Sequence, residues 1–129
     1  MANLDIKHSQ PTHIAFSDEA YTTDSRYRSV AVISFPAIWE TELNNRVKQV
    51  LSESSLSEFK WAKLRQARER FAALKLIDLA FNYAVESKLR IDVLVWDTQD
   101  SRHNIWARDD AQNLQRMYYH LFKNVLRQR

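Results

Sequence analysis

The sequence predicts a mixed α/β domain, a short sheet with helices packed on it. Two segments, 13–18 and 27–35, are rich in apolar residues and are joined by polar turn residues, which is typical of a β-hairpin. A third segment, 89–97, is rich in valine and isoleucine and follows a long helical stretch. Apolar residues occupy both odd and even positions of 27–35, which indicates a sheet covered on both faces.

A first helix is predicted over 36–51, with Pro36 as its first residue, because proline at that position loses no hydrogen bond. Its apolar stripe recurs at near-helical spacing and consists of Trp39, Leu43, Val47 and Val50. A serine-rich break over 52–58 follows, and then 59–61, which fits either a short strand or a lead-in to the next helix.

Two further helices are predicted, each with one stripe of apolar residues as its buried face. The first runs from about Ala62 to Glu86, with a stripe of Leu64, Ala67, Phe71, Leu74, Ile77, Phe81 and Ala84. The second runs from about Asp110 to the end of the chain, with a stripe of Leu114, Met117, Leu121 and Val125.

The domain organisation predicted is a flexible lead-in over 1–12 and a single domain over 13–129. The chain stops inside an apparent helix, which fits either a natural domain end or a fragment of a longer or split protein. The first residues lack the apolar core of a signal peptide, and no apolar run approaches the length of a bilayer span. A cytoplasmic protein without a membrane segment is therefore expected.

The amino-acid composition limits the kinds of metal site and phosphate-binding loop that the chain can form. The 129 residues contain no cysteine, which excludes disulfides and thiolate metal sites, and leaves carboxylates and four histidines as metal ligands. Such ligands favour Mg²⁺ or Mn²⁺. No glycine is present either, which disfavours the glycine-dependent phosphate loops of nucleotide-binding proteins. The net charge of +3 is compatible with a nucleic-acid partner without demonstrating one.

Three carboxylates stand at similar places in the predicted elements. Asp18 closes the first strand, Asp97 closes the last strand, and Glu58 precedes the segment 59–61. Ligands gather at strand ends in α/β sheets, and if these two strands are parallel neighbours, Asp18 and Asp97 approach each other. Two close carboxylates repel unless a cation lies between them, and a pair of bound divalent ions can promote phosphodiester hydrolysis.

The ordinary alternative is that these acidic residues are turn and cap residues. Asp109 and Asp110 are best explained as N-terminal cap and dipole partners of the last helix. His103 and His120 fit packing or surface positions as well as they fit a site.

Together, the segments "FSDEA" (16–20), "EFKW" (58–61) and "IDVLVWD" (91–97), with the long helix between the last two, resemble a known family. It is the ribonuclease H-like family catalogued as domain of unknown function 3800. The resemblance implies a ribonuclease H-like mixed sheet that opens with a β-hairpin and is flanked by helices. It also implies a carboxylate site for Mg²⁺ or Mn²⁺ and nuclease activity on RNA or DNA.

The resemblance also implies roles for individual residues. Asp18 matches the central metal ligand, Glu19 matches its acidic neighbour, and Asp97 matches the second ligand. Glu58 matches the glutamate of a Glu-x-Lys segment and is a further ligand, and Lys60 matches the lysine, which pairs with a carboxylate or contacts a phosphate.

The chain departs from the family pattern at two points. Tyr21 stands where the family has a glycine, and the chain ends before the aspartate that the family carries in a C-terminal helix. We therefore expect that a partner chain or further sequence completes the site.

A non-catalytic module for nucleic-acid binding or protein assembly is the alternative function. Basic residues that would contact phosphates, or simply form a solvated helix face, are Lys60, Lys63, Arg65, Arg68, Arg70 and Lys75. Aromatic residues that fit a homo-oligomer or partner interface, or simply the core, are Trp39, Trp61, Trp96, Trp106, Tyr118 and Tyr119.

Overall fold

The computed structural model describes residues 10–20, 22, 24–100, 102 and 109–127. The chain divides into two compact units. The helical unit comprises Met1–Ile14 and Phe35–Leu89, and the sheet unit comprises Ala15–Ser34 and Arg90–Arg129. The predictions made for Tyr21, His103 and Trp106 lie outside the described residues.

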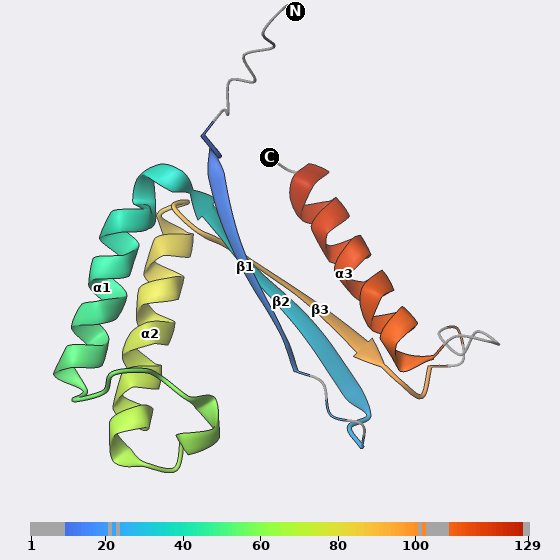
Figure 1. Cartoon of the computed structure of the whole chain (residues 1–129), viewed down its shortest axis with the longest axis horizontal. Helices are drawn as coiled ribbons and strands as arrows, with labels where there is room; N and C mark the ends of the chain where they lie inside the picture. The colour runs from blue at the N-terminus through green and yellow to red at the C-terminus, as the bar shows by residue number, and fades with distance from the viewer. Residues whose placement is uncertain (1–9, 21, 23, 101, 103–108, 128–129) are drawn as a thin grey trace, which may run out of the picture. The chain divides into compact units, whose positions relative to one another are not determined.

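The sheet has three strands, β1 (His13–Ala20), β2 (Tyr27–Pro36) and β3 (Arg90–Asp97), in the order β1-β2-β3 (Figure 1). Strands β2 and β3 pair antiparallel, with Tyr27 opposite Asp97 and Ser34 opposite Arg90. The predicted α/β class, the opening hairpin and the third strand are confirmed. The described strands form an antiparallel sheet, so they do not supply the parallel pair of a mixed sheet.

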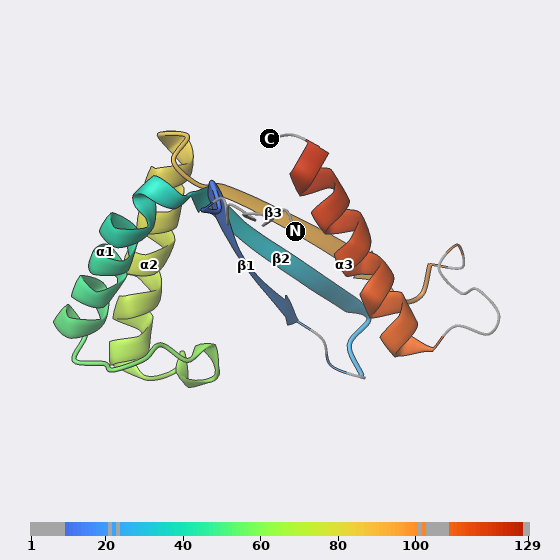
Figure 2. The ribbon, with the colours of Figure 1, turned by 45° about the horizontal axis from the view of Figure 1, so that its top comes forward.

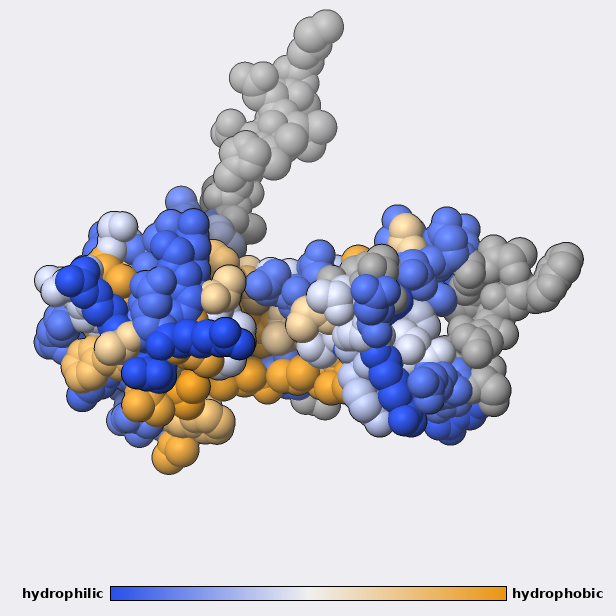
Figure 3. Space-filling model, turned by 90° about the horizontal axis from the view of Figure 1, so that it is seen from below, coloured by the Kyte–Doolittle hydropathy of each residue, from blue (hydrophilic) through white to orange (hydrophobic). Residues whose placement is uncertain are grey.

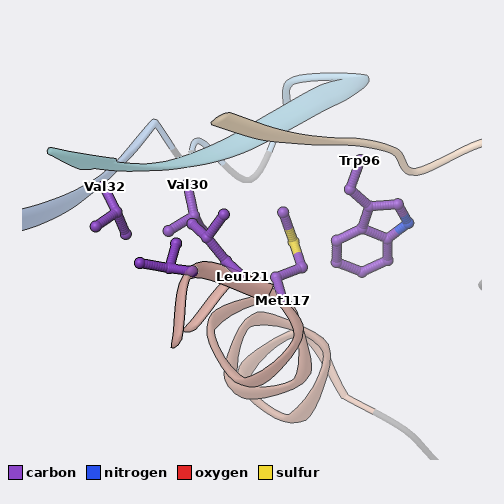
Figure 4. Close-up of a cluster of buried hydrophobic side chains, with 6 residues drawn as sticks. Val30, Val32, Trp96, Met117 and Leu121 are labelled. Carbon is purple, nitrogen blue, oxygen red and sulfur yellow. The ribbon is translucent and has the colours of Figure 1, made fainter. Parts of the chain in front are cut away.

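Helix α3 (Asp110–Arg127) lies along one face of this sheet (Figure 2). Its residues Met117 and Leu121, four positions apart and therefore on one side of the helix, pack against Val30 and Val32 of β2 and Trp96 of β3 (Figure 4). Val125 belongs to the same buried cluster, and Leu114 packs against it. The stripe predicted for the last helix is confirmed.

Two acidic residues fix the start of α3 in different ways. The N–H of Gln112 donates to Oδ1 of Asp109 (2.8 Å), and the N–H of Asp109 donates to Oε1 of Gln112 (3.2 Å), a reciprocal cap. Asp110 forms an ion pair with the buried Arg28 of β2 (3.0 Å). The predicted capping role of Asp109 is confirmed, whereas Asp110 ties α3 to the sheet.

The helical unit contains α1 (Glu40–Glu53) and α2 (Ala67–Val85), each preceded by a short 3₁₀ turn. Pro36 was predicted to begin the first helix, but its ψ of 137° is extended and it ends β2. The 3₁₀ turn η1 (Ala37–Trp39) then leads into α1. The segment after Glu58 forms no strand; it leads into a second turn, η2 (Trp61–Lys63), and the extended Gln66 delays the start of α2.

The face of α2 that packs was predicted wrongly. Ala72, Ala73 and Tyr83 are buried, whereas much of the predicted stripe is exposed: Phe71, Leu74, Ile77 and Phe81. Helix α2 is apolar on more than one side, and its two small alanines allow a neighbouring helix to approach closely. Periodicity therefore could not select the correct face.

Serines take the place of glycine at the ends of both helices. Ser55 follows α1 with φ 55°, and Ser87 follows α2 with φ 59°. In each case the next residue donates its N–H back into the helix, from Leu56 to the carbonyl of Leu51 and from Lys88 to that of Tyr83. These are left-handed C-terminal caps of the type that usually use glycine.

Candidate carboxylate site

Asp18 and Glu19 point to opposite faces of β1. The hydroxyl of Tyr118 on α3 donates a hydrogen bond to the Glu19 carboxylate, so Glu19 lies on the face that α3 covers. Successive side chains of a strand alternate, which puts Asp18 on the face opposite α3. The hydrogen bond to Glu19, helped by burial, raises the pKa of Tyr118 to about 12.

Asp97 is held by an arginine. Arg26 donates from Nε to Oδ1 (3.1 Å) and from Nη2 to Oδ2 (2.9 Å), and the N–H of Gln99 donates to Oδ1 (3.0 Å). The Arg26 hydrogen bonds, followed by that from Gln99, lower the pKa of Asp97. The neighbouring Trp96 faces α3, so Asp97 lies on the opposite face of the sheet.

Asp18 and Asp97 therefore share one face of the sheet, near the end where β1 and β3 both finish. The condition under which the two residues were expected to approach each other is not met, because β2 lies between β1 and β3. The hairpin makes β1 and β2 neighbours, and β3 pairs with the other edge of β2. Two strand spacings amount to roughly 9–10 Å, which is too far for one carboxylate to contact the other directly.

Glu58 and Lys60 belong to the helical unit, whereas Asp18 and Asp97 belong to the sheet unit. Nζ of Lys60 lies 2.9 Å from Oε1 of Glu58. Their hydrogen bond lowers the pKa of Glu58 and raises that of Lys60. Each of these two predicted site residues is thus paired with the other.

The donor set suits a hard cation, since Mg²⁺ and Mn²⁺ take oxygen ligands. A carboxylate offers about four lone-pair positions. The described contacts use one on Asp18, from the N–H of Glu19, and three on Asp97. Within the described parts of the chain, no three His, Cys, Asp or Glu side chains form a group that could hold an ion. Asp18 therefore has more free lone-pair positions than Asp97.

Sequence reasoning missed Arg26 and gave Tyr118 no role beside a carboxylate. Arg26 directly precedes Tyr27, the residue opposite Asp97, so the antiparallel register brings the arginine to that carboxylate. The register could not be read from one sequence. The spacing of Tyr118, one residue from the buried Met117, was a usable signal that it borders the sheet.

Comparison with known proteins identifies two similar proteins of Methanothermobacter thermautotrophicus, uncharacterized proteins ORF2' and ORF2. ORF2' is 41% identical over an aligned length of 129, and the alignment covers 94% of this chain and 45% of ORF2'. ORF2 is 42% identical over an aligned length of 122, and the alignment covers 88% of this chain and 43% of ORF2. The chain thus spans less than half the length of these curated relatives. No protein-family model matches the chain. No solved structure matches it either.

Among the described residues, none of the helices is both long enough and apolar enough to cross a membrane.

Proposed function

We propose that the protein is a divalent-metal-dependent nuclease of ribonuclease H-like type, acting on phosphodiester bonds of RNA or DNA. The observation that supports this most is the shared face of Asp18 and Asp97, near one end of the sheet. The resemblance of the segments around both residues to domain of unknown function 3800 supports it further. Mg²⁺ or Mn²⁺ at such carboxylates supplies positive charge to an attacked phosphodiester.

In this proposal the residues of the chain have distinct tasks. Asp18 is the principal ligand, because its carboxylate is exposed and accepts only a hydrogen bond from its neighbour among the described contacts. Asp97 contributes its remaining lone pair, and Arg26 orients it. Glu19 positions α3 through Tyr118 and leaves the opposite face to Asp18.

The test is cleavage of labelled RNA and DNA oligonucleotides with Mg²⁺, with Mn²⁺ and with EDTA. We expect metal-dependent cleavage that Asp18→Asn and Asp97→Asn each reduce by about 100-fold or more, with circular dichroism unchanged. Asp24→Asn is the matched control, because Asp24 is an exposed turn residue of the same hairpin. Unaltered cleavage in both site variants would contradict the assignment.

The second candidate is a nucleic-acid-binding module that keeps the fold without catalysis. The bidentate pairing of Asp97 with Arg26 favours it, because the guanidinium already neutralises the charge of this carboxylate, as a bound metal ion would. Arg26→Gln separates the two candidates. If Asp97 is a metal ligand, the variant binds Mn²⁺ more tightly in calorimetry; if Asp97 is a structural partner of Arg26, Mn²⁺ affinity stays the same and stability falls.

A further inference from the structure

The helical unit has an apolar groove bordered by arginines, which the predicted carboxylate site does not use. The groove has a volume of about 450 Å³ and lies beside η2 and the first half of α2. Its apolar lining includes Trp61, Leu74 and Ile77, and Arg65 and Arg70 also line it. Figure 3 shows hydrophobic side chains (orange) next to hydrophilic ones (blue) on the surface of the helical unit, at the left of the picture.

Trp61 offers a large aromatic surface in this groove. It is 64% exposed, which is costly for an indole ring that has no partner to cover it. Its ring meets Phe59 edge-on, with the centroids 6.2 Å apart and the planes at 69°. In this T-shaped contact the Phe59 and Trp61 rings are held at an angle, so the two rings are not stacked face to face.

Positive charge is concentrated around the same groove. Residues 58–77 contain six Lys and Arg side chains against two carboxylates, a local net charge of +4 in a chain whose total is +3. Of the two carboxylates, Glu69 is buried and Glu58 is bound by Lys60. Nη1 of Arg70 donates to the carbonyl of Arg65 (3.1 Å), which holds this guanidinium beside the groove.

The start of α2 adds to this field. Its N-cap residue, Gln66, forms no side-chain cap hydrogen bond, so the positive end of a 19-residue helix adjoins the arginines. An apolar ring, two guanidinium groups and a helix N-terminus together match a ligand with flat apolar parts and regularly spaced negative charges.

We propose that this groove binds single-stranded nucleic acid, with a base stacked on Trp61 and the flanking phosphates on Arg65 and Arg70. Aromatic platforms inside positively charged grooves bind single strands because every base has a stacking face. A duplex keeps its bases paired and stacked, so it cannot place one on Trp61. The proposal rests on the nucleic-acid substrate of the proposed function, but it does not depend on metal chemistry.

The test is fluorescence anisotropy of labelled single-stranded and duplex oligonucleotides with the full chain in EDTA, where binding is measured without cleavage. We expect single strands to bind more tightly than duplexes, and Trp61→Ala to weaken binding by about 5- to 150-fold. Phe81→Ala is the matched control. Phe81 lies on α2 and is an exposed aromatic residue like Trp61, but it does not line the groove. Trp61→Phe restores part of the affinity.

Salt dependence tests the arginines. Arg65→Gln and Arg70→Gln each reduce the slope of log affinity against log salt by about 0.7, the value for one phosphate contact with a single strand. Equal binding by Trp61→Ala and the native protein, or a preference for duplex, would overturn the proposal. Displacement of the oligonucleotide by polyglutamate at equal charge concentration would also overturn it, in favour of an acidic polypeptide partner.

The same variants separate this inference from the nuclease proposal. If Asp18→Asn abolishes cleavage and Trp61→Ala leaves oligonucleotide binding in EDTA intact, the proposal for the groove is contradicted and the nuclease proposal is supported. If oligonucleotide binding in EDTA depends on Trp61 while no cleavage occurs with Mg²⁺ or Mn²⁺, the proposal for the groove is supported and the nuclease proposal is contradicted.

Discussion

Helices α2 and α3 are almost equal in length, 19 and 18 residues, yet they use their apolar residues differently. Helix α3 buries its stripe against the sheet, and Leu121 is only 6% exposed. Helix α2 buries two alanines and a tyrosine and leaves Leu74 66% exposed. A helix with one apolar side buries that side in the core. A helix with several apolar sides can bury one of them and leave another exposed to a ligand.

The largest effect expected from this comparison is on stability. Leu121→Ala should lower the free energy of unfolding by about 2–5 kcal/mol, because it leaves a cavity in the cluster with Val30 and Val32. Leu74→Ala, the same change on α2, should cost less than about 0.5 kcal/mol, because the side chain is mostly exposed. Urea unfolding followed by circular dichroism measures both.

A cost for Leu74→Ala as large as that for Leu121→Ala would break the comparison. It would mean that the predicted stripe of α2 is covered in the native protein. The groove beside Trp61 would then not be open to a single strand, so this stability measurement also bears on the ligand proposed for it.

The same contrast explains how much could be predicted from sequence. The apolar residues of α3 fall on a single side of the helix, so their spacing predicts one buried face, and the structure has that face. They are Leu114, Met117, Leu121 and Val125. Asp97 was placed correctly at the end of its strand, whereas β1 continues past Asp18 to Ala20. The separation of the two residues depends on strand order, which local patterns do not encode. The partnership of Arg26 with Asp97 depends on antiparallel register, so it too required the structure.

The two helices also begin differently, and this predicts a second pair of effects. Asp109→Ala should destabilise α3 by about 1 kcal/mol, because it removes the side-chain cap that Gln112 completes. Gln66→Ser should stabilise α2 by up to about 1 kcal/mol, because Gln66 has extended geometry but makes no cap hydrogen bond. Thermal unfolding of both variants checks the opposite signs. Equal and small shifts would show that capping does not distinguish these helices.

At its other end α2 ends at Val85 and is followed by Ser87, whose positive φ is strained for a residue with a side chain. Ser87→Gly should raise the free energy of unfolding by about 0.5–1 kcal/mol, and Ser55→Gly should do the same for α1. Ser52→Gly is the control, because Ser52 lies inside α1 and glycine there should destabilise by about 0.5–1 kcal/mol. Chemical denaturation that showed the same sign for all three would contradict the left-handed caps.

The last expected effect concerns the polar tie between α3 and β1, and it is confined to high pH. The pKa of Tyr118 is raised from 10.0 to about 12 by its hydrogen bond to Glu19, so the native state holds this proton more tightly than the unfolded state. The stability it contributes is therefore complete below pH 10 and is lost as pH rises toward 12.

In a tyrosinate absorbance titration, Tyr118→Phe should remove one transition near pH 12, and Glu19→Gln should move that transition to lower pH. Tyr119→Phe, which changes the exposed neighbouring ring, should leave the transition in place. A Tyr118 that titrates at an ordinary pH in the native protein would show that α3 is held by its apolar stripe without this tie, which would sharpen its contrast with α2.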